Sequence, residues 1–313
     1  MSAKRAPLLT RLGWRLQALL WRGAMGLFAV LPIEAASALG GRAMRLLGPL
    51  LPAHRTALIN AKLCFADLDD AGARALAMAA WDNLGRLGGE FVHLHELRPF
   101  EPDGRVEVRG LEHLQAVRDS GRPAVIVTGH FANWEVMAAV ICLGGLRARV
   151  SYRHANNPFI DAHITRMRHA YGVPDLSAKN EAGVREMVLA LQKGQSVTFL
   201  NDQHFTLGVE APFFGHMLKT APGPARLARR FGAPILPVSV TRKPKARFVV
   251  TFHPPFAADD GPDKSAAIAN TVARINGFLE EQVRAHPQDW FWVHRRWPKA
   301  LYRQRDGSSA SAD

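Results

Sequence analysis

Residues 124–141 read AVIVTGHFANWEVMAAVI, and this stretch decides the fold. The apolar run 124–128 predicts a buried β-strand, and the apolar residues that follow Glu135 predict a helix. His130 lies in the turn between them, with four residues separating it from Glu135. A strand that delivers a histidine to the start of a helix is typical of an α/β sheet whose functional residues lie at the carboxyl ends of strands.

His130 and Glu135 have the residue types of a general-base pair. An imidazole titrates near neutral pH, and a carboxylate on one ring nitrogen leaves the other free to accept a proton from a substrate hydroxyl. We therefore predict that His130 is the base and that Glu135 orients it. A structural role also fits, because a histidine after a strand often caps the next helix and the helix dipole favours a carboxylate in the first turn.

Short apolar runs alternate with helical segments along most of the chain. Strands are predicted at 106–108, 124–128, 149–152, 197–200, 235–240 and 248–252. Helices are predicted at 111–118, 133–143, 158–171, 181–192, 221–231 and 264–285, and 69–97 predicts one long helix or two that break near Gly88 and Gly89. The pattern predicts an α/β fold: one domain, residues 34–305, with a central mixed sheet flanked by helices. His130, Arg153 and Asp202 each follow a predicted strand, so we expect them to face one cleft.

The N-terminal residues 1–33 predict an amphipathic membrane-associating helix. No acidic residue occurs between positions 8 and 30, and Lys4, Arg11, Arg15 and Arg22 fall on one narrow arc of a helix whose remainder is rich in leucine and tryptophan. A signal peptide fits poorly because arginines interrupt the apolar region. A spanning helix also fits poorly, because the arginine-free run 23–33 is shorter than the roughly 20 residues that a bilayer requires. Packing of this helix on the protein's own core is the alternative.

Charge and cysteine content restrict the partners and the compartment. The formal net charge is +13, which favours anionic partners such as acidic lipids, an acidic carrier protein or nucleic acid. We expect no nucleic acid, because the basic residues are spread along the chain and no binding motif is present. Cys64 and Cys142 give no disulfide framework, which suits a reducing compartment, and residues 306–313 predict a disordered tail.

Several blocks of the chain resemble one enzyme family. The heptad 129–135, GHFANWE, resembles the His-x4-Asp or His-x4-Glu signature of the lysophospholipid acyltransferase superfamily. Its Asn-Trp-Glu ending is similar to that of the late acyltransferases of lipid A biosynthesis, the lauroyl and myristoyl transferases. Further blocks match in order: YRHANNP at 152–158, DQ at 202–203, APFFG at 211–215 with Thr220, and RAHPQDWFWVHRRW at 284–297. Ala132 stands where the family usually has glycine, and His154 where proline is common.

This resemblance implies a membrane-associated O-acyltransferase with a fold like that of glycerol-phosphate acyltransferases. Such an enzyme moves a fatty acyl chain from an acyl carrier protein (ACP) or coenzyme A thioester to a hydroxyl of a lipid A precursor or a related anionic lipid. It implies the cytoplasmic face of the bacterial inner membrane as the location. No cofactor and no metal are expected, because the thioester is a substrate and acyl transfer requires neither. A covalent acyl-enzyme is not expected, since no Gly-x-Ser-x-Gly motif occurs.

The resemblance also implies substrate-binding residues. They are Asn133, Arg153, Asn157, Asp202, Gln203, Phe213, Phe214, Gly215, Thr220 and Arg295. A guanidinium such as that of Arg153 can bind phosphate in a bidentate way, although pairing with Asp161 is an alternative. Phe213 and Phe214, with Met217 and Leu218, either line an acyl tunnel or belong to the core. Arg295 lies in a basic aromatic patch, residues 294–299, that suits membrane or carrier contact or simply a solvated end.

Two other functions remain open at this point. A metal-dependent hydrolase would use Asp161, His163, His130 and His204, since histidine and carboxylate bind several divalent ions, although no tight ligand motif occurs. A non-catalytic basic protein that binds membranes or nucleic acid would explain the charge alone.

Overall fold

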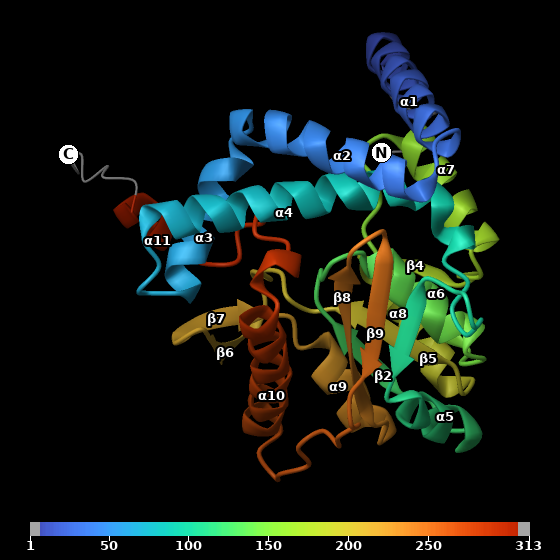
Figure 1. Ribbon diagram of the computed structural model, residues 1–313. Helices are drawn as coiled ribbons and strands as arrows, with labels where there is room; N and C mark the ends of the chain where they lie inside the picture. The colour runs from blue at the N-terminus through green and yellow to red at the C-terminus, as the bar shows by residue number, and fades with distance from the viewer. Residues whose placement is uncertain (1–6, 306–313) are drawn as a thin grey trace.

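The computed structural model describes residues 7–305 of the chain (Figure 1). The helices are α1 (Leu8–Ala29), α2 (Ile33–Leu47), α3 (Ala53–Cys64), α4 (Asp70–Glu90), α5 (Leu111–Asp119), α6 (Trp134–Leu143), α7 (Pro158–Ala170), α8 (Glu181–Gln192), α9 (Gly223–Phe231), α10 (Lys264–Ala285) and α11 (Lys299–Arg305). Short 3-10 helices are η2 (Gly48–Leu50), η3 (Phe91–Glu96) and η4 (Pro287–Asp289).

The strands form a seven-stranded sheet and a separate hairpin. They are β1 (Val106–Arg109), β2 (Val125–Thr128), β3 (Ala148–Tyr152), β4 (Leu176–Ala178), β5 (Ser196–Leu200), β6 (Val209–Phe213), β7 (His216–Thr220), β8 (Ile235–Lys243) and β9 (Arg247–Phe252). The order in the main sheet is β1-β9-β8-β2-β5-β3-β4, and β6 pairs with β7. Only the β8–β9 pair is antiparallel in the main sheet, so β8, β2, β5, β3 and β4 run in one direction. The predicted mixed sheet flanked by helices is therefore confirmed.

The core lies on both faces of this sheet because successive residues of a strand point to opposite sides. In β2, Val125 and Val127 belong to the cluster that contains Ile275 of α10, whereas Ile126 belongs to the cluster that contains Val136 of α6. All three β2 residues have no exposed surface. Burial on both faces explains why β2 reads as a continuous apolar run and why it stands in the middle of the sheet.

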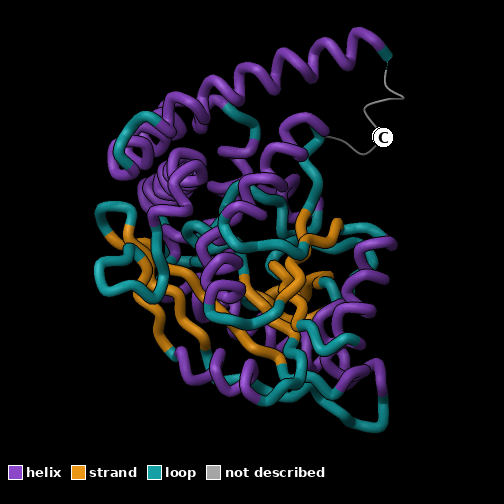
Figure 2. The backbone as a smooth tube through the Cα atoms, turned by 90° about the vertical axis from the view of Figure 1, so that its right-hand side faces the viewer, coloured by secondary structure: helices purple, strands orange, loops and turns teal. Residues whose placement is uncertain are grey.

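Helices α1, α2 and α4 lie at one end of the molecule, above the sheet in Figures 1 and 2. Helices α2 and α4 lie side by side in opposite directions, with their backbones in near contact. A Cβ atom added at Gly40 of α2 would lie 2.2 Å from the carbonyl oxygen of Gly85 of α4, and one added at Gly89 would lie 2.2 Å from the carbonyl oxygen of Ala36. Any larger side chain at these glycines would therefore separate the two helices.

The predicted elements agree with the structure except at a few places. The six predicted strands and the six predicted shorter helices are present within a few residues of their expected ends. Of the two alternatives for 69–97, the single helix agrees better with the structure, because α4 continues through Gly88 and Gly89 to Glu90 and then tightens into η3. The strands β4, β6 and β7 were not predicted.

Residues 8–29 form helix α1, as predicted, and its association with a membrane stays a prediction. Lys4 and the tail 306–313 lie outside the described residues. Within the part of the chain that the structure describes, no helix is long and apolar enough to cross a membrane.

Candidate active site

The candidate site lies where several strands of the sheet end together. The loop 129–133 follows β2, Asp202 follows β5, Arg153 follows β3 and Lys179 follows β4. These strands are parallel neighbours, so their carboxyl ends share one edge. The backbone N–H of Asn201 donates to the carbonyl of Thr128 at 2.9 Å and holds the ends of β5 and β2 together. His130, Arg153 and Asp202 thus follow strands that end at one edge of the sheet, and that they face one cleft stays a prediction.

Asp202 holds His130 from two sides. Its Oδ1 atom lies 2.7 Å from Nδ1 of His130, and its Oδ2 atom accepts the backbone N–H of His130 at 2.8 Å. The indole N–H of Trp290 donates to the same Oδ2 atom at 2.8 Å. With Nδ1–H donating to the carboxylate, Nε2 of His130 carries the free lone pair.

Asp202 stays ionised although its side chain is only 3% exposed. Burial raises the pKa of this carboxyl, but the charge of His130 and the hydrogen bonds from His130 and Trp290 lower it more, so the pKa falls well below its usual range. The carboxylate can therefore fix the tautomer of His130 and stabilise the imidazolium that forms when His130 accepts a proton.

Aromatic rings pack against His130, and its side chain stays partly exposed. The Trp134 ring packs edge-on at 5.0 Å between centroids, and the Phe291 ring lies at 5.7 Å. The His130 side chain keeps 13% of its surface exposed. The amide nitrogen of Gln203 is 3.4 Å from Nε2, a long and weak hydrogen bond that a substrate hydroxyl can replace. Gln203 is therefore at the site, as predicted.

Glu135 does not orient His130, and this part of the prediction was wrong. Both of its carboxylate oxygens accept hydrogen bonds from Arg168 of α7, at 2.6 and 2.8 Å. Glu135 stands in the first turn of α6, after the chain has turned away from His130 through Ala132, and it is nearly buried. Glu135 therefore links helix α6 to helix α7, whereas the carboxylate that binds the imidazole belongs to Asp202, after the neighbouring strand β5.

The loop that carries His130 contains a strained residue that its neighbours hold in place. Ala132 has φ of 45°, a left-handed conformation in which glycine avoids the cost of a Cβ atom, so the usual family glycine at this position has a structural reason. The N–H of Ala132 donates to the carbonyl of Asp289 at 2.7 Å, and its carbonyl accepts from the side-chain amide of Asn83 at 3.2 Å. Phe131 pairs with Trp290 in an isolated β-bridge.

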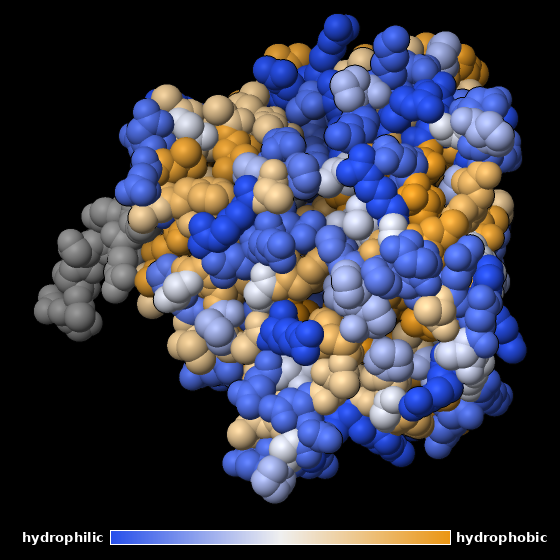
Figure 3. Space-filling view, turned by 60° about the horizontal axis from the view of Figure 1, so that its bottom comes forward, coloured by the Kyte–Doolittle hydropathy of each residue, from blue (hydrophilic) through white to orange (hydrophobic). Residues whose placement is uncertain are grey.

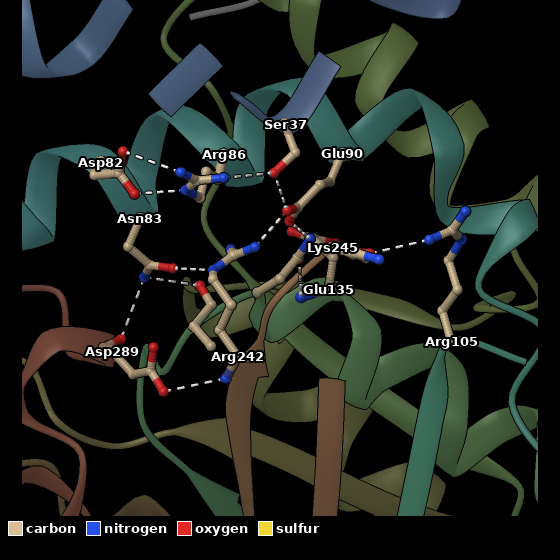
Figure 4. Close-up of polar contacts among 12 residues, drawn as sticks. Ser37, Asp82, Asn83, Arg86, Glu90, Arg105, Glu135, Arg242, Lys245 and Asp289 are labelled. Carbon is tan, nitrogen blue, oxygen red and sulfur yellow. Dashed lines mark hydrogen bonds and ion pairs between the residues drawn. The ribbon is translucent and has the colours of Figure 1, made fainter. Parts of the chain in front are cut away.

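A buried polar network connects this loop to the helices above it (Figure 4). The fully buried carboxylate of Glu90, at the end of α4, accepts hydrogen bonds from Ser37 of α2 and Asn133 at 2.7 and 3.0 Å, and it pairs with Arg242 of β8. Arg242 also donates to the carbonyl oxygen of the Asn83 side chain at 2.8 Å. The carboxylate is thus satisfied without water, as a charge at this depth requires.

Asn133 is part of this network and not free for substrate. Its Oδ1 atom caps α6 by accepting the N–H of Glu135 at 3.2 Å, while its amide N–H binds Glu90. The residue has no exposed surface. The structure thus corrects the predicted substrate-binding role of Asn133 to one that fixes the start of α6.

Two cations lie at the same edge as Asp202. Arg153 is exposed, and its alternative partner Asp161 instead accepts from the N–H of Ala155 at 2.8 Å and bonds His154 at 2.7 Å. The pKa of Lys179 is lowered, because desolvation and the charge of Arg153 together outweigh the opposing effect of the Asp202 charge. The Lys179 residue remains exposed to solvent. Arg153 and Lys179 therefore place positive charge where an anionic substrate would approach the site.

Asn157 anchors helix α1, and its predicted role in substrate binding stays a prediction. Its side-chain oxygen caps α7 by accepting the N–H of Phe159 at 3.0 Å. Its amide nitrogen donates to the carbonyl of Trp14 at 2.7 Å and to the side chain of Gln17 at 3.2 Å. The Trp21 and His163 rings meet edge-on at 5.0 Å and add a second contact between α1 and α7.

Phe213 and Phe214 are buried core residues. Phe213 packs against Trp290 and Trp297, and Phe214 packs against Phe65, so the core alternative applies to this pair. Phe214 and Gly215 form the two-residue turn of the β6–β7 hairpin with φ of 47° and 73°. Gly215 thus serves the turn.

Thr220 is buried and accepts the Arg296 guanidinium at 2.6 Å and the Asn276 amide at 3.2 Å. Burial lowers the pKa of Arg296 to about 10. Arg295, the predicted binding residue, is exposed and stacks on Tyr302 at 5.9 Å. Arg296, and not the predicted Arg295, is thus the buried arginine, and it donates a hydrogen bond to Thr220.

The four residues of the metal alternative are not brought together. Between residues 7 and 305, no group of three or more histidines, cysteines and carboxylates is placed to hold a metal ion. His130 is bound to Asp202, and Asp161 is bound to His154.

Comparison with known proteins identifies the family. The family described as bacterial lipid A biosynthesis acyltransferase matches residues 9–299. The chain belongs to this family. This acyltransferase is 29% identical over 283 residues to the lipid A biosynthesis palmitoleoyltransferase of Escherichia coli (strain K12), with 88% of this chain and 89% of that protein covered. It is 28% identical to the lipid A biosynthesis lauroyltransferase of the same organism over 248 residues, or 76% of each chain.

A less similar relative is named for a different lipid. This acyltransferase is 25% identical over 235 residues to the phosphatidylinositol mannoside acyltransferase of Mycobacterium tuberculosis (strain CDC 1551 / Oshkosh), with 74% of this chain and 72% of that protein covered. Among solved structures, the 1-acyl-sn-glycerophosphate acyltransferase of Thermotoga maritima is 15% identical with a TM-score of 0.35, over 78% of this chain and 97% of that chain. The last likeness is too distant to bear on the assignment.

Proposed function

We propose that this acyltransferase moves a fatty acyl chain from an ACP or coenzyme A thioester to a hydroxyl of an anionic lipid, with a lipid A precursor as the acceptor. His130 is the general base and Asp202 orients it. The observation that carries the proposal is the 2.7 Å contact between Nδ1 of His130 and Asp202, which leaves Nε2 as the accessible nitrogen. The family assignment supports acyl transfer as the reaction, and the cations Arg153 and Lys179 support an anionic acceptor.

The reaction follows from this geometry. Nε2 of His130 removes the proton of the acceptor hydroxyl while the oxygen attacks the thioester carbonyl. The tetrahedral intermediate collapses as the carbon–sulfur bond breaks, and the imidazolium returns its proton to the departing thiolate. Asp202 remains ionised throughout and stabilises the imidazolium. A positioned base contributes about 10²–10⁴-fold to the rate.

We further propose that the enzyme is attached to the cytoplasmic face of the inner membrane through α1. Leu9, Leu16 and Leu19 on this helix are at least half exposed, and Arg11, Arg15 and Arg22 lie among them. Leucines and arginines of one helix suit the boundary between acyl chains and phosphate groups. The acceptor lipid is then reached from the membrane surface.

The test measures transfer by detergent-dispersed enzyme from labelled acyl-ACP and, separately, labelled acyl-coenzyme A to a lipid A precursor. We expect His130→Ala to lose at least about a hundredfold in kcat. His95→Ala, which removes an exposed histidine away from the site, is the matched control and should keep full activity. Transfer should persist in EDTA.

Three results would contradict parts of the proposal. Unchanged transfer by folded His130→Ala would remove the base. Loss of turnover in EDTA would favour the hydrolase. Transfer to another anionic lipid, such as a phosphoinositide mannoside, without transfer to the lipid A precursor would replace the acceptor and keep the mechanism.

A further inference from the structure

Exposed apolar residues are concentrated in the first two helices and the turn that follows them. Thirteen of the twenty exposed large hydrophobic side chains described by the structure lie between residues 8 and 51. Eight of them belong to α1 and its end. The other five form what we call the leucine face, on α2, η2 and the residue after it: Leu39, Leu46, Leu47, Leu50 and Leu51. These side chains are 41–80% exposed.

Helix α2 has its three leucines on the outside because small residues form much of its inner face. Gly40 and Ala36 touch the backbone of α4 at Gly85 and Gly89, where a Cβ atom at any of the three glycines would clash. An ordinary surface helix buries its large apolar side chains and exposes polar ones. The reversed pattern leaves the five leucines of this face 41–80% exposed, and gathered exposed apolar side chains mark interaction sites.

The charged residues of the segment that carries the leucine face are almost all positive. Arg42 and Arg45 are exposed on α2 between the leucines. From residue 8 to residue 66 the only acidic residue is Glu34, which pairs with Arg105 at 2.7 Å. Leucines that enter the acyl region beside arginines at phosphate level are the combination that binds an anionic bilayer surface.

The position of the leucine face also fits a membrane. Helices α1 and α2 lie at the same end of the molecule (Figures 1 and 2). The face that Figure 3 brings forward is mostly hydrophilic, with hydrophobic residues interspersed. Beneath α2, Asn83 of α4 binds the carbonyl of Ala132 in the His130 loop. Helices α2 and α4 would thus separate a bilayer on the leucine face from the loop that carries the base.

We propose that the leucine face is a second bilayer contact, beside α1, that binds the surface of a membrane rich in anionic phospholipid. Two contacts on one rigid body fix the orientation of the enzyme, whereas α1 alone would act as a tether. This inference rests on one part of the proposed function, namely that the acceptor lipid lies in the bilayer.

The test uses the full chain and vesicle flotation. Vesicles of phosphatidylglycerol and phosphatidylethanolamine are mixed with wild type or with the variant Leu46→Ser, Leu47→Ser, Leu50→Ser, Leu51→Ser. We expect at least about a tenfold loss of vesicle partitioning, because four leucines leave the acyl boundary. The control is Val184→Ser, Leu189→Ser, Leu207→Ser, which removes side chains of similar exposure elsewhere and should bind as wild type.

A charge variant separates the two parts of the contact. Arg42→Glu with Arg45→Glu should weaken binding to the anionic vesicles at least about tenfold and leave the weaker binding to pure phosphatidylcholine unchanged. Detergent-dispersed substrate should be turned over normally by both variants, which distinguishes failure of this inference from failure of the proposed function. Wild-type partitioning of the serine variant would overturn it. The inference would also be overturned if the serine variant bound vesicles normally but no longer self-associated, because the leucine face would then be a contact between two copies of the chain.

Discussion

Two carboxylates stand near His130, one close in sequence and one far, and the far one binds it. Glu135 lies four intervening residues away and pairs with Arg168, whereas Asp202 lies on the next strand of the sheet and holds both the backbone and the ring of His130. The left-handed turn at Ala132 changes the direction of the chain between His130 and Glu135, and the two side chains contact different partners. Parallel pairing of β2 with β5 brings Asp202 opposite His130. The comparison teaches that strand adjacency, and not sequence spacing, assembles this pair.

The sharpest way to break this comparison is Asp202→Asn. The amide keeps the shape but cannot stabilise the imidazolium, and it can reverse the tautomer of His130. We expect kcat to fall by about 10²–10⁴-fold with little change in KM. Steady-state kinetics with a folded variant, verified by circular dichroism, measure this. Activity within threefold of wild type would show that Asp202 only packs there.

The second test asks whether Glu135 acts through Arg168 alone. Glu135→Gln should lower the free energy of unfolding by about 3 kcal/mol, because Arg168 keeps a buried charge without its carboxylate. Adding Arg168→Met, which retains the packing on Tyr152, should recover much of that loss. Urea unfolding follows both variants. The double variant should keep kcat within about tenfold of wild type; a loss as large as that of Asp202→Asn would return a catalytic role to Glu135.

A smaller effect is expected from the pH dependence of stability at His294. Burial lowers the pKa of His294 to about 4, and its Nε2 atom is buried without a hydrogen-bond partner in the described structure. The unfolded chain binds this proton near pH 6.5, so the stabilisation is present above that pH and is lost as the pH falls from 6.5 toward 4. His294→Gln should reduce the loss of stability between pH 7 and 5. Urea midpoints at both pH values test this, with exposed His95→Gln as the control. An unchanged slope would mean that His294 is protonated in the folded protein.

The smallest expected effect is at Ala132, in the turn between His130 and Glu135. Ala132→Gly removes the strain of a φ of 45°, which raises the stability of the folded protein. The greater entropy of glycine in the unfolded chain offsets part of this gain, so we expect a net rise of less than about 1 kcal/mol and an unchanged kcat. Thermal unfolding measures it. A destabilisation above this size would show that the Ala132 methyl group, which is fully buried, contributes packing that outweighs the strain.

The central sheet was predictable because its strands are buried on both faces and read as apolar runs. Strand β4 has only three residues, too few for a periodic pattern. The β6–β7 hairpin was missed because Pro212 within β6 argues against a strand, and here the proline stands exposed on a hairpin that is separate from the main sheet.

The site was predictable only as a set of strand ends. The sequence places His130 and Asp202 after strands, but nothing in it orders β5 directly beside β2, with β3 on the far side of β5. Glu90 and Arg242 carried no local signal either, because one ends a helix and the other lies in a strand, and only the packing of α4 on the sheet joins them. Strand order and helix docking depend on the whole chain.

The contacts from Asp289 and Trp290 have a consequence for when the enzyme becomes active. Asp289 accepts the N–H of Ala132, and Trp290 donates to Asp202, so the loop and the carboxylate that bear on His130 both depend on residues about 160 and 90 positions further along the chain. A nascent chain on the ribosome already holds the histidine and the aspartate before these residues are made. A chain that has not yet reached Asp289 and Trp290 therefore lacks both contacts, and the surroundings of His130 are complete only once these residues have folded into place.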